Sequence, residues 1–115
     1  MLFCVSEPLL RVLNESGTTH DDPTAEVLLD LLADVEQGHE GFLIVERTDD
    51  PSGHTYAQTA RLDDGSFTVE YRDGSAERHF ATHVVDVRGA YEVLTGWAFG
   101  RRGWHDGRQW RRLVF

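Results

Sequence analysis

Four residues near the middle of the chain have side chains suited to acid–base chemistry. Glu70, Glu77, Arg78 and His79 fall on two segments that flank a predicted hairpin. A carboxylate, a guanidinium and an imidazole on neighbouring strands can act as general base, anion stabiliser and general acid, as in small microbial ribonucleases. Strand alternation argues against one shared site, because Arg78 and His79 would point to opposite faces. The alternative interpretation is a cross-strand charge network in which Arg72 or Arg78 relieves the Glu70–Glu77 pair.

Metal binding and covalent catalysis have less support. His79 and His83 are four residues apart, but that spacing on a strand does not bring two imidazoles together, and a metal site needs three or four convergent ligands. Cys4 has no second cysteine to pair with, which indicates a reducing compartment, and we interpret it as a core thiol. We therefore predict a non-enzymatic protein with no catalytic residue, no metal and no cofactor.

A second pattern is acidic. Glu26, Asp30 and Asp34 are spaced four residues apart, so on a helix they stack on one face, where like charges cost roughly 0.2–0.5 kcal/mol per pair. Glu36 and Glu40 follow, and no arginine or lysine lies in this segment. Such a face is either a hydrated, solubilising surface or a binding surface for a cationic partner.

Charge is unevenly distributed along the chain. The net charge is −9, with −10 in residues 1–50 and +4 in residues 101–115. A field this negative repels nucleic acid and anionic membranes and speeds encounter with basic proteins, so we expect no nucleic-acid or membrane partner.

Trp104 lies among the C-terminal arginines, and Trp and Arg are the residues that anchor protein interfaces. All eleven basic residues are Arg, which suggests the GC-rich coding of actinobacteria.

Two helices are predicted. In the first, Asp22 is the expected N-cap, Pro23 the first helical position and Gly38 the stop. Its inward stripe comprises Ala25, Leu28, Leu32 and Val35, widened by Leu29 and Leu31. The second helix runs from about Val87 to Phe99 with Asp86 as its cap, because its apolar residues recur at i, i+3, i+4 and i+7.

The strands predict a meander. Expected strands cover residues 41–47, 55–62, 66–71, 76–82 and 109–115, the first of them buried on both faces. A two-residue loop at Asp73-Gly74 would pair Phe67 with Phe80 and Glu70 with Glu77. The polar composition of residues 14–22 predicts a loop. The pattern of residues 1–13 does not decide between strand and helix. The expected fold is a single α+β domain over residues 1–115. It has one antiparallel sheet of four to five strands, an N-terminal helix, and a second helix before the last strand, with both helices on one face.

No targeting segment is expected. Residues 1–13 are interrupted by Glu7, Pro8 and Arg11, so they do not form the basic leader and apolar run of a signal peptide. No stretch approaches the roughly 20 apolar residues of a membrane span. We therefore expect a cytoplasmic protein.

Four segments resemble one set of small actinobacterial proteins. They are ERTDDPSG (46–53), YAQTARLDDGSFTVEYRDG (56–74), RHFAT (78–82) and GWAFGRRGW (96–104). Their layout is similar to an immunity-protein family of bacterial polymorphic-toxin systems, which has a leading helix, a D-x-P-x-G turn, a sheet with a D-G hairpin, and a helix before a Trp-bearing end. In this chain the turn is Asp50-Pro51-Ser52-Gly53, so the proline comes one place early. The resemblance implies a non-enzymatic partner that blocks a toxin, and it implies no catalytic residues.

The leading hypothesis is therefore an immunity-type inhibitor that binds a basic protein, such as a secreted nuclease or deaminase toxin. The proposed partner-binding residues are Glu26, Asp30, Asp34, Glu36, Glu40 and Trp104. Two alternatives stay open: a small ribonuclease-like hydrolase that uses the Glu, Arg and His residues of the sheet, and a homo-oligomeric or ligand-binding structural module.

Overall fold

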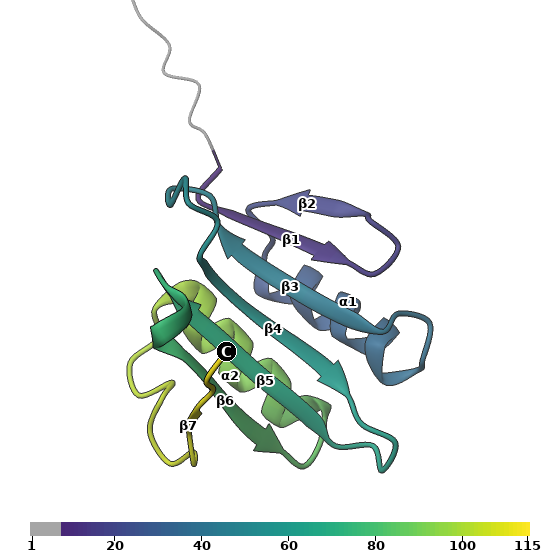
Figure 1. Cartoon of the computed structure of the whole chain (residues 1–115). Coiled ribbons are helices and arrows are strands. Elements are labelled where there is room, and N and C mark those ends of the chain that lie inside the picture. Colours follow the sequence, from purple (N-terminus) through teal and green to yellow (C-terminus); the bar gives the residue numbers. More distant parts are fainter. Residues whose placement is uncertain (1–7) are drawn as a thin grey trace, which may run out of the picture.

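The structure, a computed structural model, describes residues 8–115 as an α+β fold with one antiparallel sheet and two helices. Figure 1 shows both helices behind the sheet, so one sheet face is covered and the other is open. We call these the inner and the outer face. The elements are β1 (Leu10–Asn14), β2 (Thr19–Asp21), α1 (Ala25–Glu36), β3 (Phe42–Arg47), β4 (Thr55–Arg61), β5 (Phe67–Asp73), the 3-10 turn η1 (Ala76–Arg78), β6 (His79–Val84), α2 (Val87–Phe99) and β7 (Arg111–Arg112).

The sheet has seven strands in the order β2-β1-β3-β4-β5-β6-β7, so the prediction of four to five strands was wrong. The extra strands are β1 and β2. β1 lies mostly in residues 1–13, whose pattern did not decide between strand and helix, and β2 lies where a polar loop was predicted. All three residues of β2 are exposed, because β2 is an edge strand with no buried side. Such a strand has no alternation of apolar and polar residues, and sequence periodicity does not detect it. The interpretation of Cys4 lies outside the described residues.

The start of α1 also differs from the prediction. Thr24, and not Asp22, is the N-cap, and its hydroxyl accepts a hydrogen bond from the Val27 amide at 3.2 Å. The backbone of Asp22 has a positive φ of 46°. Its carboxylate accepts hydrogen bonds from the amides of Leu9 (2.9 Å) and Leu10 (3.1 Å). It therefore ties the start of β1 to the end of β2 and does not serve the helix.

The core lies between the inner face and the helices. The fully buried side chains of α1 are the predicted Leu28, Leu32 and Val35, whereas Leu29 is exposed. α2 spans Val87–Phe99 as predicted, and the Asp86 carboxylate accepts a hydrogen bond from the Gly89 amide at 2.9 Å. The sheet contributes Val12, Leu43, Val45, Ala57, Phe67 and Val69. In β3 only alternate residues are fully buried, so the strand is covered on the inner face and not on both.

The β5–β6 hairpin has a different register from the predicted one. Glu70 pairs with Ala81, and Tyr71, not Phe67, pairs with Phe80. The connection is longer than two residues because η1 follows Gly74 and occupies the positions assigned to the returning strand. This shift takes Glu77 and Arg78 out of the sheet. β7 pairs only through Arg111 and Arg112, so it is shorter than the predicted strand over residues 109–115.

Candidate functional site

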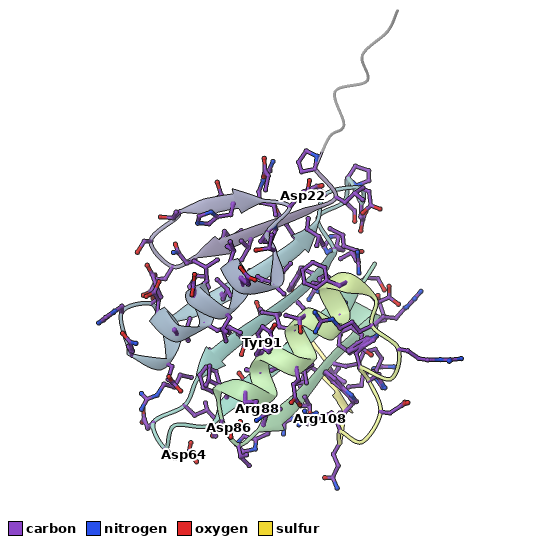
Figure 2. All side chains as sticks on the ribbon, turned by 180° about the vertical axis from the view of Figure 1, so that it is seen from behind. Asp22, Asp64, Asp86, Arg88, Tyr91 and Arg108 are labelled. Atoms are coloured by element: carbon purple, nitrogen blue, oxygen red, sulfur yellow. The ribbon has the colours of Figure 1, made fainter. Side chains whose placement is uncertain are left out.

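The carboxylates of α1 form an exposed acidic stripe. Glu26, Asp30 and Asp34 lie on the side of the helix away from Leu28, Leu32 and Val35; Glu26 and Asp30 are exposed, and Asp34 is half-buried. We call these three carboxylates the acidic stripe. In Figure 2 the two helices lie in front of the sheet, so this side of the molecule carries no further layer.

The acidic stripe has no arginine partner within residues 8–115. Asp34 has a histidine beside it: His39 Nδ1 lies 4.0 Å from the Asp34 carboxylate. The arginines pair elsewhere: Arg11 with Asp21 at 2.8 Å, Arg78 with Asp73, and both Arg88 (3.4 Å) and Arg108 (3.2 Å) with Glu92 of α2. The C-terminal arginines therefore do not neutralise the first helix.

The other proposed binding residues do not join the stripe. Glu36 is exposed but lies on the opposite flank of α1, in line with Leu29 seven residues earlier. The Glu40 carboxylate accepts hydrogen bonds from the amide (3.1 Å) and the hydroxyl (2.6 Å) of Ser16, so it holds the β1–β2 turn against the end of α1.

Trp104 lies in an aromatic cluster at the C-terminal end of α2. Tyr71, Trp104, His105 and Trp110 pack with ring centroids 4.9 to 5.9 Å apart. The Tyr71 hydroxyl lies 3.1 Å from His105 Nε2, and burial raises the pKa of Tyr71. Gly96 of α2 makes this packing fit, because a Cβ there would overlap the Cβ of Trp104. Trp104 is half-buried and attaches residues 101–110 to the domain.

The outer face carries a second polar arrangement. The buried imidazole of His79, only 2% exposed, lies 2.8 Å from the Glu70 carboxylate through Nε2. Arg72 Nε donates to His79 Nδ1 at 3.1 Å. Because an arginine N–H can only donate, Nδ1 must be unprotonated, and Nε2 must carry the proton that it donates to Glu70. His79 is thus a neutral imidazole that orients one oxygen of Glu70.

Aromatic rings close over this network. His79 packs edge-on against Tyr56 (6.0 Å) and Phe115 (4.9 Å), and the Arg72 guanidinium lies over the same two rings at 5.6 and 5.2 Å. Figure 1 shows the C-terminal segment crossing the open side of the sheet. His79 is therefore shielded, whereas the Glu70 side chain stays 25% exposed.

The four residues considered for acid–base chemistry are not assembled. Glu70 and His79 meet, but Glu77 and Arg78 lie in η1, where both are exposed. Arg78 pairs with Asp73. The backbone amide of Glu77 itself and the Ser75 hydroxyl donate to the Glu77 carboxylate and lower its pKa. Half of the predicted set is on the outer face, and half is in the turn beside it.

An open groove of about 790 Å³ lies beside Glu70, and the sequence did not indicate it. It runs between the outer face of β5 and β6 and the segment Gly107–Leu113. Its lining includes Glu70, His83 and Arg111, and only Glu70 of these belonged to the predicted set. The sequence feature that could have pointed to the groove is the small residue Ala81. Its position between Glu70 and Arg111 is known only from the observed strand register.

A hydrogen-bonded chain holds His83 at the end of this groove. His83 Nε2 lies 2.8 Å from the Ser66 hydroxyl, which donates to the Asp64 carboxylate. These Ser66 contacts lower the pKa of Asp64. Figure 2 places Asp64 at the end of the sheet, away from Arg108.

Within residues 8–115, no group of three His, Cys, Asp or Glu side chains could hold a metal ion. No helix in the same range is long and apolar enough to cross a membrane. Comparison with known proteins found no matching protein family, no matching curated protein and no matching solved structure.

Proposed function

We propose that this protein is a non-enzymatic, cytoplasmic inhibitor of the immunity type, which binds a cationic protein through the acidic stripe of α1. One observation carries the proposal: Glu26, Asp30 and Asp34 face outward and have no arginine partner within residues 8–115. Adjacent like charges on a helix are destabilising, and a partner's Arg or Lys would relieve that repulsion on binding. The free protein would thus hold a site in a less favourable state than the complex.

The stripe would act mainly on the rate and selectivity of association. Charge complementarity steers encounter, whereas apolar anchors lengthen the lifetime of a complex. Val27 and Leu31 are half-buried beside the stripe, and Leu29 is 46% exposed on the other flank of α1. These apolar side chains are nearer to the stripe than Trp104, which belongs to the aromatic cluster. The proposal therefore depends on α1 and not on Trp104.

The expected target is a nuclease or deaminase toxin. Such enzymes bind a polyanion and so need a positive groove, which an acidic surface could occlude. The resemblance of residues 42–110 to an immunity-protein family supports the same target class, and it is the source of the inhibitor role.

The test is co-purification with the product of the adjacent open reading frame. We expect a complex, and we expect Asp30→Arg with Asp34→Arg to weaken it at least tenfold, which is about 1.4 kcal/mol. The matched control is Asp49→Arg with Asp63→Arg, which changes the net charge equally at two exposed turns. The proposal fails if the adjacent product does not bind, or if both double variants bind as the wild type does.

A further inference from the structure

The outer face carries apolar side chains, and no helix of residues 8–115 covers it (Figure 1). Those on β1, β3 and β4 alternate with the core residues of the same strands, and all are half-buried. They are Leu13, Phe42, Ile44, Tyr56 and Ala60. A hollow of about 190 Å³ lies among them, beside Gln58. An exposed apolar patch with polar residues around it is typical of a docking surface.

The outer face is also neutral, although the chain is strongly acidic. Strand pairing places three acids and three arginines on it, namely Asp21, Glu46, Glu70, Arg11, Arg72 and Arg111. The whole chain carries −9, so the excess negative charge lies elsewhere in the chain. Two copies that approach through an acidic surface, such as the acidic stripe, repel each other. A second copy therefore meets less repulsion at the outer face than at α1.

The charges of the outer face are distributed unevenly between its two ends. The β2–β1–β3 end has two acids and one arginine, and the β5–β6–β7 end has one acid and two arginines. A two-fold axis parallel to the strands lays the acidic end of one copy over the basic end of the other, so opposite charges meet twice. Within residues 8–115, the exposed Arg111 side chain makes no ion pair or hydrogen bond. It is free to contact the acidic end of a second copy.

The edges of the sheet are poorly suited to joining two copies. β2 has three residues, all exposed, and β7 consists of Arg111 and Arg112. Short, charged edge strands oppose pairing with a strand of another molecule. Two sheets can instead pack face to face, with their strands aligned to within about 30° and the sheets roughly 10 Å apart.

The size of the outer face indicates a weak association. The longer strands, β1 and β3 to β6, give a face of roughly 400–500 Å² at about 4.8 Å between strands and 3.3 Å per residue. Two such faces bury roughly 1,000 Å² together, which is the lower limit for a specific interface. The dissociation constant of such a dimer should be roughly 10–100 μM.

We propose that the protein forms a two-fold dimer in which the outer face packs against the outer face of a second copy of this chain. The two sheets lie inside the dimer and the helices outside, so both acidic stripes stay exposed. The interface uses no residue of α1, and it does not rest on the proposed inhibitor function.

Sedimentation equilibrium of the full chain from about 1 μM to about 1 mM tests the proposal. We expect a reversible monomer–dimer equilibrium with its midpoint at tens of micromolar. A monomer mass at every concentration would overturn it. Masses that grow beyond a dimer would also overturn it, because a two-fold interface closes at two copies.

Ile44→Arg places a charge in the apolar part of the face and should raise the dissociation constant at least tenfold. The matched control is Leu29→Arg, which puts the same charge on an exposed apolar position of α1 and should leave the dimer unchanged. Circular dichroism would show that both variants are folded. Wild-type affinity in folded Ile44→Arg, or a loss found only in Leu29→Arg, would contradict the proposed interface.

Arg111→Glu tests the orientation without altering the apolar patch. The new carboxylate would face the acidic end of the second copy, so the dimer should weaken several-fold. The control Arg102→Glu changes the net charge equally in the loop after α2 and should have a smaller effect. A tighter dimer in Arg111→Glu would contradict the two-fold arrangement. Asp30→Arg with Asp34→Arg should leave the dimer intact even if it abolishes partner binding.

Discussion

At the scale of single residues, His79 is the most constrained polar group of the outer face. It is buried, it accepts from Arg72, and it donates to Glu70. A buried polar group held by two partners stabilises a fold mainly because removing it leaves those partners unsatisfied. The network therefore has a structural role whether or not a second copy covers the outer face.

His79→Ala should destabilise the protein by about 2–4 kcal/mol, because it leaves a cavity and two unpaired partners. Urea denaturation would measure this loss, with His20→Ala on the exposed strand β2 as the control. Nitrogen NMR at neutral pH should show the Nε2–H tautomer of His79. A protonated Nδ1 in the folded protein would contradict the hydrogen-bond assignment.

Asp50 gives a prediction about pH. The hydroxyls of Thr55 (2.6 Å) and Ser52 (2.7 Å) and the Ser52 amide (3.0 Å) donate to its carboxylate and lower its pKa below the ordinary 3.8. A carboxyl group whose pKa is lower in the folded state stabilises the fold above its unfolded-state pKa. This contribution is lost as the pH falls through the folded-state pKa.

Asp50→Asn should therefore be less stable than the wild type at pH 6, and the difference should shrink as the pH falls below about 4. Urea midpoints measured across this pH range would test it. The control is Asp49→Asn in the same turn, because the Asp49 carboxylate makes no hydrogen bond within residues 8–115. A difference that is constant with pH would refute the explanation.

At the scale of elements, the sequence predicted the helices and strands in which apolar residues recur at a regular spacing. α2 was placed correctly because its apolar period continues from Val87 to Phe99 between Asp86 and Gly100. Strands were also predicted over residues 55–62 and 66–71, close to the observed β4 and β5. β2 and β7 were missed or misjudged because edge strands of two or three residues carry no period.

The candidate sites were less predictable than the elements. Glu26, Asp30 and Asp34 share a face because helical spacing alone decides it. The outer-face groups depend on strand register, and η1 changed that register by replacing the expected two-residue loop. The sequence could not show that Arg111 and His83 would line the groove with Glu70, because they come together only through two successive strand pairings.

Gly96 allows Trp104 of the C-terminal segment to pack closely against α2. Replacing glycine by alanine inside a helix ordinarily stabilises it by about 0.5–1 kcal/mol. At Gly96 the added Cβ would overlap the Cβ of Trp104, so the sign should reverse. We expect Gly96→Ala to cost about 1–3 kcal/mol and to expose Trp104. Thermal unfolding and tryptophan fluorescence would measure both, and an increase in stability would contradict the packing.

At the scale of the whole molecule, the order of the strands gives the uneven charge along the sequence an uneven distribution across the fold. The strands follow chain order from β3 to β7, with the β1–β2 hairpin at the opposite edge (Figure 1). The described part of the acidic half, residues 8–50, therefore lies toward one edge, and residues 101–115, with a net charge of +4, lie toward the other. The molecule is electrically polar, which orients it in the field of a charged partner.

This polarity predicts a salt-dependent encounter. The association rate constant with a cationic partner should fall roughly tenfold or more from low to high ionic strength, whereas the dissociation rate should change less. Stopped-flow fluorescence with the adjacent gene product would measure both. An association rate that is indifferent to salt would argue that the complex forms through its apolar contacts alone.

The central claim is that the partner docks on α1. Hydrogen–deuterium exchange of the complex with the adjacent gene product tests it most directly, because it locates the covered surface without altering the chain. The account predicts new protection concentrated in Ala25–Glu36, with β6 and β7 unchanged. Protection confined to β6, β7 or the aromatic cluster, with α1 exchanging as in the free protein, would contradict it.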